Sequence, residues 1–236
     1  MFVIKASGQK EEFSKEKIRK TCLRAGASRE LADEVARQVY KRAYNGIPTR
    51  KILEIILRLL KKDPIVAIRY DIKRAIMSLG PKGFYFEKFF AAILKNYGYN
   101  IEVNRKLRGL CVVHEIDVVA NKDLRYMVEC KYHNFAGIHT DLKVALYTYA
   151  RFLDLKKFFD RAWLVTNTKI SNDAIQYAKC KNIKITSWHY PHNENLQVLM
   201  DQKKLYPITL LKPVNRFTMG RLVESGFILT KDLLDY

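Results

Sequence analysis

The pattern of predicted secondary structure changes at one break, Gly80-Pro81-Lys82-Gly83, and this change constrains the fold more than any other feature of the chain. Before the break, a short pair of strands is followed by a series of helices. After the break, one helix precedes strands that later alternate with helices, which is the order of an α/β sheet. A chain of 236 residues is long enough for two domains, and we place their boundary at this break.

Residues 1–80 predict an α+β domain, a small hairpin followed by four helices. Residues 2–13 are typical of two short strands joined at Ser7-Gly8, where glycine supplies the positive φ that such turns often need. Each expected helix begins at a residue type that is favoured at helix N-termini. These are Ser14 (helix to about 25), Ser28 (to about 44), Thr49 (to about 62) and Pro64 (to about 80).

Residues 81–190 predict an α/β domain with a mixed central sheet, and residues 191–236 form a C-terminal extension that we expect to be a small helical module. In the extension, the pattern near the end indicates a helix capped by Thr230. The elements expected in the α/β domain are a helix over 84–97, strands over 101–106, 111–120 and 126–131, a helix over 142–158, a buried strand over 162–168, a helix over 171–181 and a strand over 183–188.

Three ionisable side chains that could take part in catalysis lie on neighbouring predicted strands: Asp117, Glu129 and Lys131. The two-residue period of a strand puts Glu129 and Lys131 on one face, while Cys130 points away and offers only its carbonyl. A hairpin closing through 121–125 brings Asp117 against Glu129. Two carboxylates repel each other unless a cation holds them, so the pattern predicts a site for a hard divalent ion such as Mg²⁺ or Mn²⁺.

Lys131 complements these carboxylates, since an ammonium group there can position or deprotonate an attacking water and stabilise charge on a phosphate. Glu87, on the preceding helix within a largely aromatic stretch, is a further candidate ligand. An isolated Glu-x-Lys on a strand is usually a surface pair. The apolar flanks and the preceding aspartate favour a functional site here, because charged residues are seldom buried without a partner.

Three histidines, His114, His133 and His139, lie near this segment. Their spacing does not define a zinc site, and the chain contains no HxH or HExxH motif. His133 is two residues beyond Lys131 and is a candidate phosphate contact. Tyr147 and Tyr149 are expected to pack within their helix rather than to stack on bases.

Residues 81–190 resemble the PD-(D/E)xK nuclease superfamily, in its Mrr-like restriction endonuclease branch. The resemblance implies that Asp117, Glu129 and Glu87 bind metal and that Lys131 is catalytic. Mrr enzymes often carry Gln where Glu129 stands, and the acidic form, found across the wider superfamily, favours metal binding. The motifs that carry the resemblance are Gly83-Phe84-Tyr85-Phe86-Glu87, Glu115-Ile116-Asp117, Glu129-Cys130-Lys131 and the strand and helix over 165–178.

Residues 2–78 resemble the ATP-cone, a hairpin-plus-helices domain that binds adenine nucleotides and regulates ribonucleotide reductases. The resemblance is carried by residues 3–18, 46–52 and 66–74. The family usually has Arg where Ala6 stands, so one phosphate contact is missing. The roles implied by the resemblance are phosphate binding by Lys5, Lys17 and Lys73, contact with the base by Val3, Ile18 and Thr49, and contact with the sugar or base edge by Glu11.

Each of these residues also has a purely structural interpretation. Thr49 has the residue type of a helix N-cap, Lys17 that of a solvated first-turn residue, and Val3 and Ile18 those of core positions. The ordered set as a whole favours nucleotide binding. The chain contains no GxxxxGK[ST] motif, so we expect the nucleotide to act as a ligand and not as a fuel.

The balance of charge favours a polyanionic partner. The chain has 43 Lys and Arg against 24 Asp and Glu, a net charge of +19. With the two resemblances, this predicts a metal-dependent DNA endonuclease with an adenine-nucleotide-binding regulatory domain, and we expect a homo-oligomer, with a dimer as the first choice. Two alternatives stay open: a nucleotide-responsive DNA-binding regulator without cleavage, and an RNA- or junction-specific nuclease on the same fold.

No apolar run approaches the roughly 20 residues that span a bilayer, so we expect no membrane partner. The first residues show no apolar run of signal-peptide length. The four cysteines lie far apart without a CxxC pair. These features favour a reducing, cytoplasmic location and argue against a disulfide framework or a Cys-rich zinc site.

Overall fold

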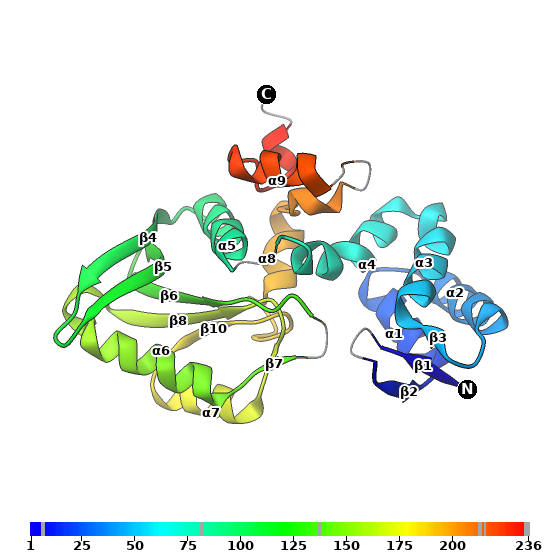
Figure 1. The fold of residues 1–236 in the computed structure, drawn as a ribbon, viewed down its shortest axis with the longest axis horizontal. Coiled ribbons are helices and arrows are strands. Elements are labelled where there is room, and N and C mark those ends of the chain that lie inside the picture. The colour runs from blue at the N-terminus through cyan, green and yellow to red at the C-terminus, as the bar shows by residue number, and fades with distance from the viewer. Residues whose placement is uncertain (6–7, 81–82, 136–137, 212–213, 215, 234–236) are drawn as a thin grey trace. The chain divides into compact units, whose positions relative to one another are not determined.

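The structure is a computed structural model of the chain, and it describes residues 1–5, 8–80, 83–135, 138–211, 214 and 216–233 (Figure 1). The sequence features at Ala6, Ser7, Pro81 and Lys82 lie outside the described residues. The chain divides into two compact units, Met1–Arg74 and Ala75–Tyr236.

The sheet of the first unit contains the expected hairpin and one strand that the sequence analysis missed. Strands β1 (Phe2–Ile4) and β2 (Lys10–Glu12) pair in antiparallel fashion. A third strand, β3 (Ile47–Pro48), pairs with β1 in parallel, giving the order β2-β1-β3. A strand of two residues has no alternation to detect, so only its pairing reveals it.

The helices of the first unit follow local capping signals, with one exception. The hydroxyl groups of Ser14 and Ser28 accept backbone N–H groups at 3.2 and 3.1 Å, as N-caps do. The expectation that Thr49 caps its helix is wrong, because Pro48 holds the N-cap position and Thr49 is already helical. The helices are α1 (Lys15–Arg24), α2 (Arg29–Arg42), α3 (Thr49–Leu59), the short 3₁₀ helix η1 (Leu60–Lys62) and α4 (Pro64–Met77), which continues into the second unit.

The second unit is built on a mixed five-stranded sheet, as predicted, with the order β10-β8-β6-β5-β4. Its first three strands along the chain pair in antiparallel fashion, β8 pairs with β6 in parallel, and β10 pairs with β8 in parallel. The strands are β4 (Asn100–Arg108), β5 (Val113–Asn121), β6 (Arg125–Lys131), β8 (Arg161–Thr166) and β10 (Lys184–Thr186). A separate parallel pair joins β7 (His139–Thr140) to β9 (Lys169–Ile170).

Helices cover both faces of this sheet (Figure 1). Helix α5 (Phe84–Asn96) lies on one face, where Phe90 packs edge-on against Trp163 at 5.5 Å between ring centroids. Helices α6 (Leu142–Asp154) and α7 (Asn172–Cys180) lie on the other and share a core with Met127 and Leu164. The helix predicted over 142–158 ends earlier than expected, and a 3₁₀ turn, η2 (Lys156–Phe158), follows it.

The C-terminal residues contain α8 (Leu196–Lys203), η3 (Ile208–Leu210), α9 (Arg216–Glu224) and η4 (Thr230–Leu233). The helix that we expect at Thr230 is this short 3₁₀ turn, in which Thr230 is the first residue and not the cap.

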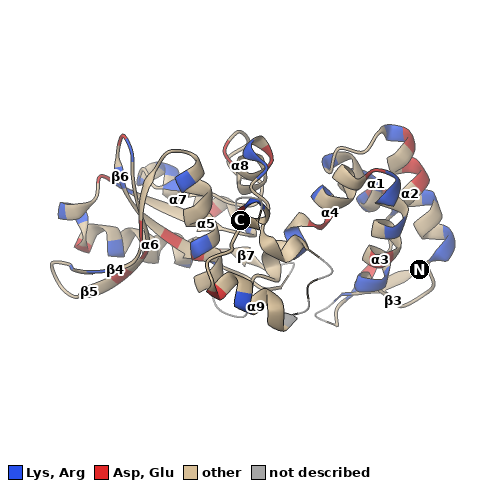
Figure 2. Ribbon diagram, turned by 90° about the horizontal axis from the view of Figure 1, so that it is seen from above, with Lys and Arg blue, Asp and Glu red and all other residues tan. Residues whose placement is uncertain are grey.

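No helix in the described ranges is both long and apolar enough to cross a membrane. All four cysteines are free thiols, as expected. Lys and Arg residues occur in both units (Figure 2).

Candidate active site

The predicted catalytic residues lie where two strands of the sheet separate. The hydrogen-bonded ladder between β5 and β6 runs from the Asn121–Arg125 pair to the Val118–Val128 pair and ends there. Strand β6 stays paired with β8 as far as its last residue, Lys131. The two strands therefore diverge at the next positions along each of them, which are occupied by Asp117 and Glu129.

The Asp117 carboxylate bridges this divergence. Its Oδ2 atom accepts a hydrogen bond from the backbone N–H of Cys130 at 2.7 Å. If the ladder continued, this N–H would instead donate to a backbone carbonyl of β5. Burial raises the pKa of Asp117, while the Cys130 N–H and the nearby Arg151 guanidinium oppose that shift. The aspartate is thus held by the backbone of the strand that carries Glu129 and Lys131.

Glu129 and Lys131 follow on β6 and differ in their exposure. The Glu129 side chain is largely buried and forms an ion pair with Arg151. Burial raises the pKa of Glu129 to about 7, the negative charge of Asp117 adds to the shift, and Arg151 and Lys131 oppose it. Lys131 is exposed at the strand end, so its ammonium group is accessible to a substrate.

Glu87 reaches this group of charges from α5. It lies in the first turn of the helix, and its pKa is raised to about 7, mainly by burial and then by the charges of Asp117 and Glu129. The space around it is tight, because a Cβ added at Gly83 would lie 3.4 Å from Glu87 Oε1. The structure thus brings the three carboxylates that we predict as ligands into one electrostatic environment.

The chemistry of these donors fits a hard divalent cation. Within the described ranges, no group of three or more His, Cys, Asp or Glu side chains is arranged closely enough to hold a metal ion. Glu87, Asp117 and Glu129 nevertheless offer only carboxylate oxygens, the donors that Mg²⁺ and Mn²⁺ prefer. The charge of Asp117 raises the pKa values of Glu87 and Glu129, an unfavourable state that a divalent cation would relieve.

The raised pKa values predict how the metal-free protein responds to pH. Between about pH 4.5 and pH 7, a carboxyl group with a raised pKa keeps its proton in the folded state, whereas the same group in the unfolded chain has lost it. The free energy of unfolding therefore falls as pH rises through this range. Glu87→Gln removes this effect. We therefore compare the difference in melting temperature between the variant and the wild type at two pH values. This difference should be about 2–4 °C larger at pH 8 than at pH 5, which corresponds to about 1 kcal/mol in the free energy of unfolding.

The comparison with the variant is needed because His133 acts in the opposite direction. Burial and the charge of Lys131 lower its pKa, so protonation of His133 destabilises the fold as pH falls. Both proteins contain this histidine, and the difference between their melting temperatures cancels its contribution. A difference that stays constant across the pH range would contradict the assignment to Glu87.

Arg151 belongs to the site, and the sequence analysis missed it. Its side chain is only 9% exposed, and it forms the ion pair with Glu129 and donates to the backbone carbonyl of Glu115. A signal was present in the sequence, because Arg151 falls on the same helix face as the buried residues Thr148 and Phe152. A charged residue in an apolar helix face indicates a buried partner.

The expectation that Tyr147 packs within its helix is not met. Tyr147 is 57% exposed rather than packed, and the Arg151 guanidinium lies 5.4 Å from the centre of its ring. His133 lies beyond the end of β6, where its backbone N–H donates to Asn167 at 2.9 Å and its ring contacts Thr140 at 3.2 Å. The role of His133 as a phosphate contact stays a prediction.

In the first unit, three of the predicted nucleotide-binding residues meet in one charged group. The Glu11 carboxylate forms one ion pair with Lys5, at 2.5 Å, and another with Lys17. Two of the three predicted phosphate ligands, Lys5 and Lys17, therefore share one carboxylate, which a bound phosphate would have to replace. Register places Pro48 opposite Ile4, so Thr49 lies near the end of β1.

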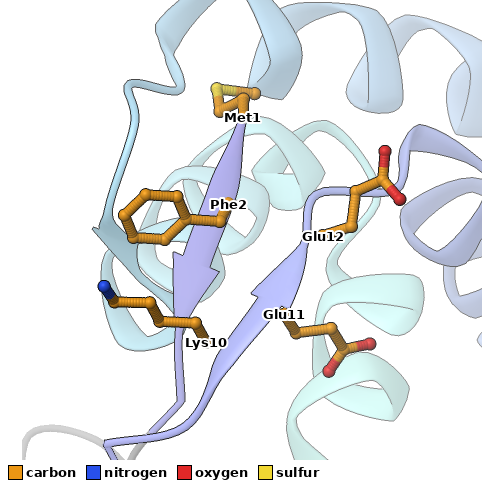
Figure 3. A pocket seen from close by; sticks show the side chains of 5 residues that line it. All are labelled: Met1, Phe2, Lys10, Glu11 and Glu12. Carbon is orange, nitrogen blue, oxygen red and sulfur yellow. The ribbon is translucent and has the colours of Figure 1, made fainter.

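The other predicted residues of this set are placed differently. Val3 and Ile18 are buried in the hydrophobic core, which limits their contact with a ligand. Lys73 lies on α4. An open hollow of about 440 Å³ lies beside the hairpin, lined by Met1, Phe2, Lys10, Glu11 and Glu12 (Figure 3). Among the described residues of the predicted set, Glu11 alone lines it.

The mixed sheet, its two helical layers and the carboxylates at the strand divergence define the second unit as restriction-endonuclease-like. The family model described as restriction endonuclease matches residues 80–191, and the model described as ATP cone domain matches residues 1–77.

Proteins of similar sequence and structure match part of this chain. An uncharacterized protein of Archaeoglobus fulgidus is 45% identical over 146 residues, covering 61% of this chain and 83% of its own. A second uncharacterized protein of the same organism is 55% identical over 42 residues, 18% of this chain and 87% of its own. The crystal structure of the protein of unknown function AF1548 is 42% identical, with a TM-score of 0.61, and covers 65% of this chain and 84% of that one. The chain therefore belongs to the family of the larger Archaeoglobus protein and joins an ATP cone domain to a restriction endonuclease domain.

Proposed function

We propose that the protein is a metal-dependent DNA endonuclease that hydrolyses phosphodiester bonds. The observation that carries the proposal is the arrangement at the end of the β5–β6 ladder. There, Asp117 accepts the backbone N–H of Cys130 on β6, and Glu129 and Lys131 flank Cys130 on the same strand. A restriction endonuclease domain with such a site has both the acidic groups to hold a cation and the ammonium group to act on phosphate.

Each residue has a defined task in this proposal. Asp117, Glu129 and Glu87 would hold Mg²⁺ or Mn²⁺, which acts as a Lewis acid and lowers the pKa of bound water. The exposed Lys131 ammonium orients the attacking water and stabilises the negative charge that develops on the phosphate. The burial of Glu129 and Asp117 strengthens these electrostatic effects, because water screens charges less in a buried site.

DNA is the proposed substrate because the protein is strongly basic, with a net charge of +19. The direct test is incubation with linear, circular and branched DNA and with RNA, each with and without Mg²⁺ or Mn²⁺. Metal-dependent cleavage of DNA supports the proposal. Cleavage confined to RNA or to branched DNA would replace it with one of the alternative nucleases, and binding without cleavage would indicate a DNA-binding regulator.

The ATP cone domain is proposed to bind an adenine nucleotide through Lys5 and Lys17. A ligand that binds only the folded state stabilises it by about 2.7 kcal/mol at 100 times its Kd, so ATP is expected to raise the melting temperature of the wild type. Lys5→Ala should lose this shift. Lys20→Ala is the matched control, because Lys20 lies on the same unit and pairs with Glu16 instead of Glu11. An equal shift in all three proteins would contradict the role of Lys5.

We further propose that nucleotide binding regulates cleavage through the assembly of a homo-oligomer. This requires that ATP bind two states of the protein with different affinities, since equal affinities shift no equilibrium. The measurements are the cleavage rate and the oligomeric mass with and without ATP. If ATP produces a thermal shift but changes neither quantity, the regulatory proposal fails and the nuclease proposal stands.

A further inference from the structure

Arg151 connects the two strands at the point where their own hydrogen bonds end. Its Nη1 atom contacts Glu129 Oε2 on β6, and its Nη2 atom donates to the Glu115 carbonyl on β5. The β5–β6 ladder has already ended at the Val118–Val128 pair. One guanidinium group from α6 therefore spans the gap that contains the proposed metal ligands.

The geometry of arginine suits this task. Its planar guanidinium presents several donors in fixed directions and can contact two acceptors at once, whereas the ammonium group of lysine is a single point of charge. Only one Glu129 oxygen, Oε2, takes part in the contact with Nη1. The other carboxylate oxygen can still serve as a metal ligand.

Burial of Arg151 is costly for the fold. The residue is 8% exposed, and its Nε atom has no hydrogen-bond partner among the described residues. A buried ion pair of this kind often contributes less to stability than well-packed apolar side chains would. The arrangement is better explained by what it does to Glu129 than by a gain in stability.

We propose that Arg151 is a positioning residue for the metal site, and this inference rests on the proposed function. It holds Glu129 Oε2 with one nitrogen and anchors itself on the β5 backbone with another. The remaining Glu129 oxygen is thereby fixed in the orientation in which it coordinates the cation. Residues that support a metal ligand in this way typically contribute about 10- to 100-fold to metal affinity or activity.

Mn²⁺ titration of the full-length protein by calorimetry tests the proposal without relying on cleavage. Arg151→Met and Arg151→Lys should each weaken Mn²⁺ binding by about tenfold or more, because neither side chain can bridge Glu129 and the Glu115 carbonyl. Lys143→Met is the matched control: it removes the same charge from an exposed position of α6 and should bind Mn²⁺ as the wild type does. Thermal unfolding of the metal-free proteins identifies any variant that has lost its fold.

The double variant Glu129→Gln with Arg151→Met separates positioning from general damage. If Arg151 acts through Glu129, the double variant should bind Mn²⁺ as Glu129→Gln alone does, and independent effects would instead add. Wild-type affinity in both Arg151 variants, or full additivity in the double variant, would overturn the inference while leaving the metal site intact. If the wild type itself fails to bind Mn²⁺, the proposed metal site fails, and the inference fails with it.

Discussion

Lys131→Ala is expected to reduce phosphodiester cleavage by about 10³-fold or more, while DNA affinity changes only slightly. The reason is that Lys131, exposed at the end of β6, is assigned to the water and to the charge that develops in the transition state. An interaction made only in the transition state lowers the rate without weakening ground-state binding. Single-turnover cleavage and DNA binding, measured on the same preparation, separate the two effects.

Lys143→Ala serves as the control for Lys131→Ala. It removes one positive charge from an exposed position of α6 in the same unit, so any general electrostatic contribution to DNA binding is lost equally. The control should cleave at nearly the wild-type rate. Full cleavage by Lys131→Ala would exclude the mechanism proposed here, and a parallel loss of DNA affinity would reassign Lys131 to substrate binding.

Asp117→Asn is expected to weaken Mn²⁺ binding by about 100-fold or more and to abolish metal-dependent cleavage. The substitution removes a charge from a site that needs negative charge to hold a hard cation. The effect should exceed the roughly 10- to 100-fold losses typical of residues that only support a ligand. The amide oxygen of asparagine can still accept the Cys130 N–H that Asp117 accepts at 2.7 Å, so the strand divergence is preserved.

Glu115→Gln is the matched control for Asp117→Asn. Glu115 lies two residues earlier on β5, and its exposed carboxylate pairs with Lys106 at 3.8 Å. The neutral substitution should leave Mn²⁺ affinity nearly unchanged, while the backbone carbonyl that Arg151 contacts is retained. Calorimetry that shows equal Mn²⁺ affinity in Asp117→Asn and the wild type would contradict the assignment of Asp117 as a metal ligand.

Features that depend on a few neighbouring residues could be predicted from the sequence. The caps at Ser14 and Ser28 are local, because a side chain bonds a backbone group three residues away. The mixed sheet follows from the order of strands and helices after the break at Gly80. The two-residue period of a strand places Glu129 and Lys131 on one side of β6, and this inference does not depend on which strands pair with β6.

The remaining features depend on contacts between residues far apart in the sequence. The register of β5 and β6 ends their ladder at the Val118–Val128 pair, and this opens the space in which Asp117 meets the Cys130 N–H. The packing of α6 on the sheet brings Arg151 to Glu129, 22 residues away. Likewise, the parallel pairing of β3 with β1 puts Pro48 at the helix cap in place of Thr49.

The sequence alone therefore determined which chemical groups the protein has and which strand or helix carries each of them. The tertiary structure decided which of those groups meet, and it added Arg151 to the site. The physical reason is that secondary structure follows short-range periodicity and capping. Strand register and helix packing instead depend on how the apolar surface of the whole domain is buried. A pattern of a few neighbouring residues carries no information about that burial.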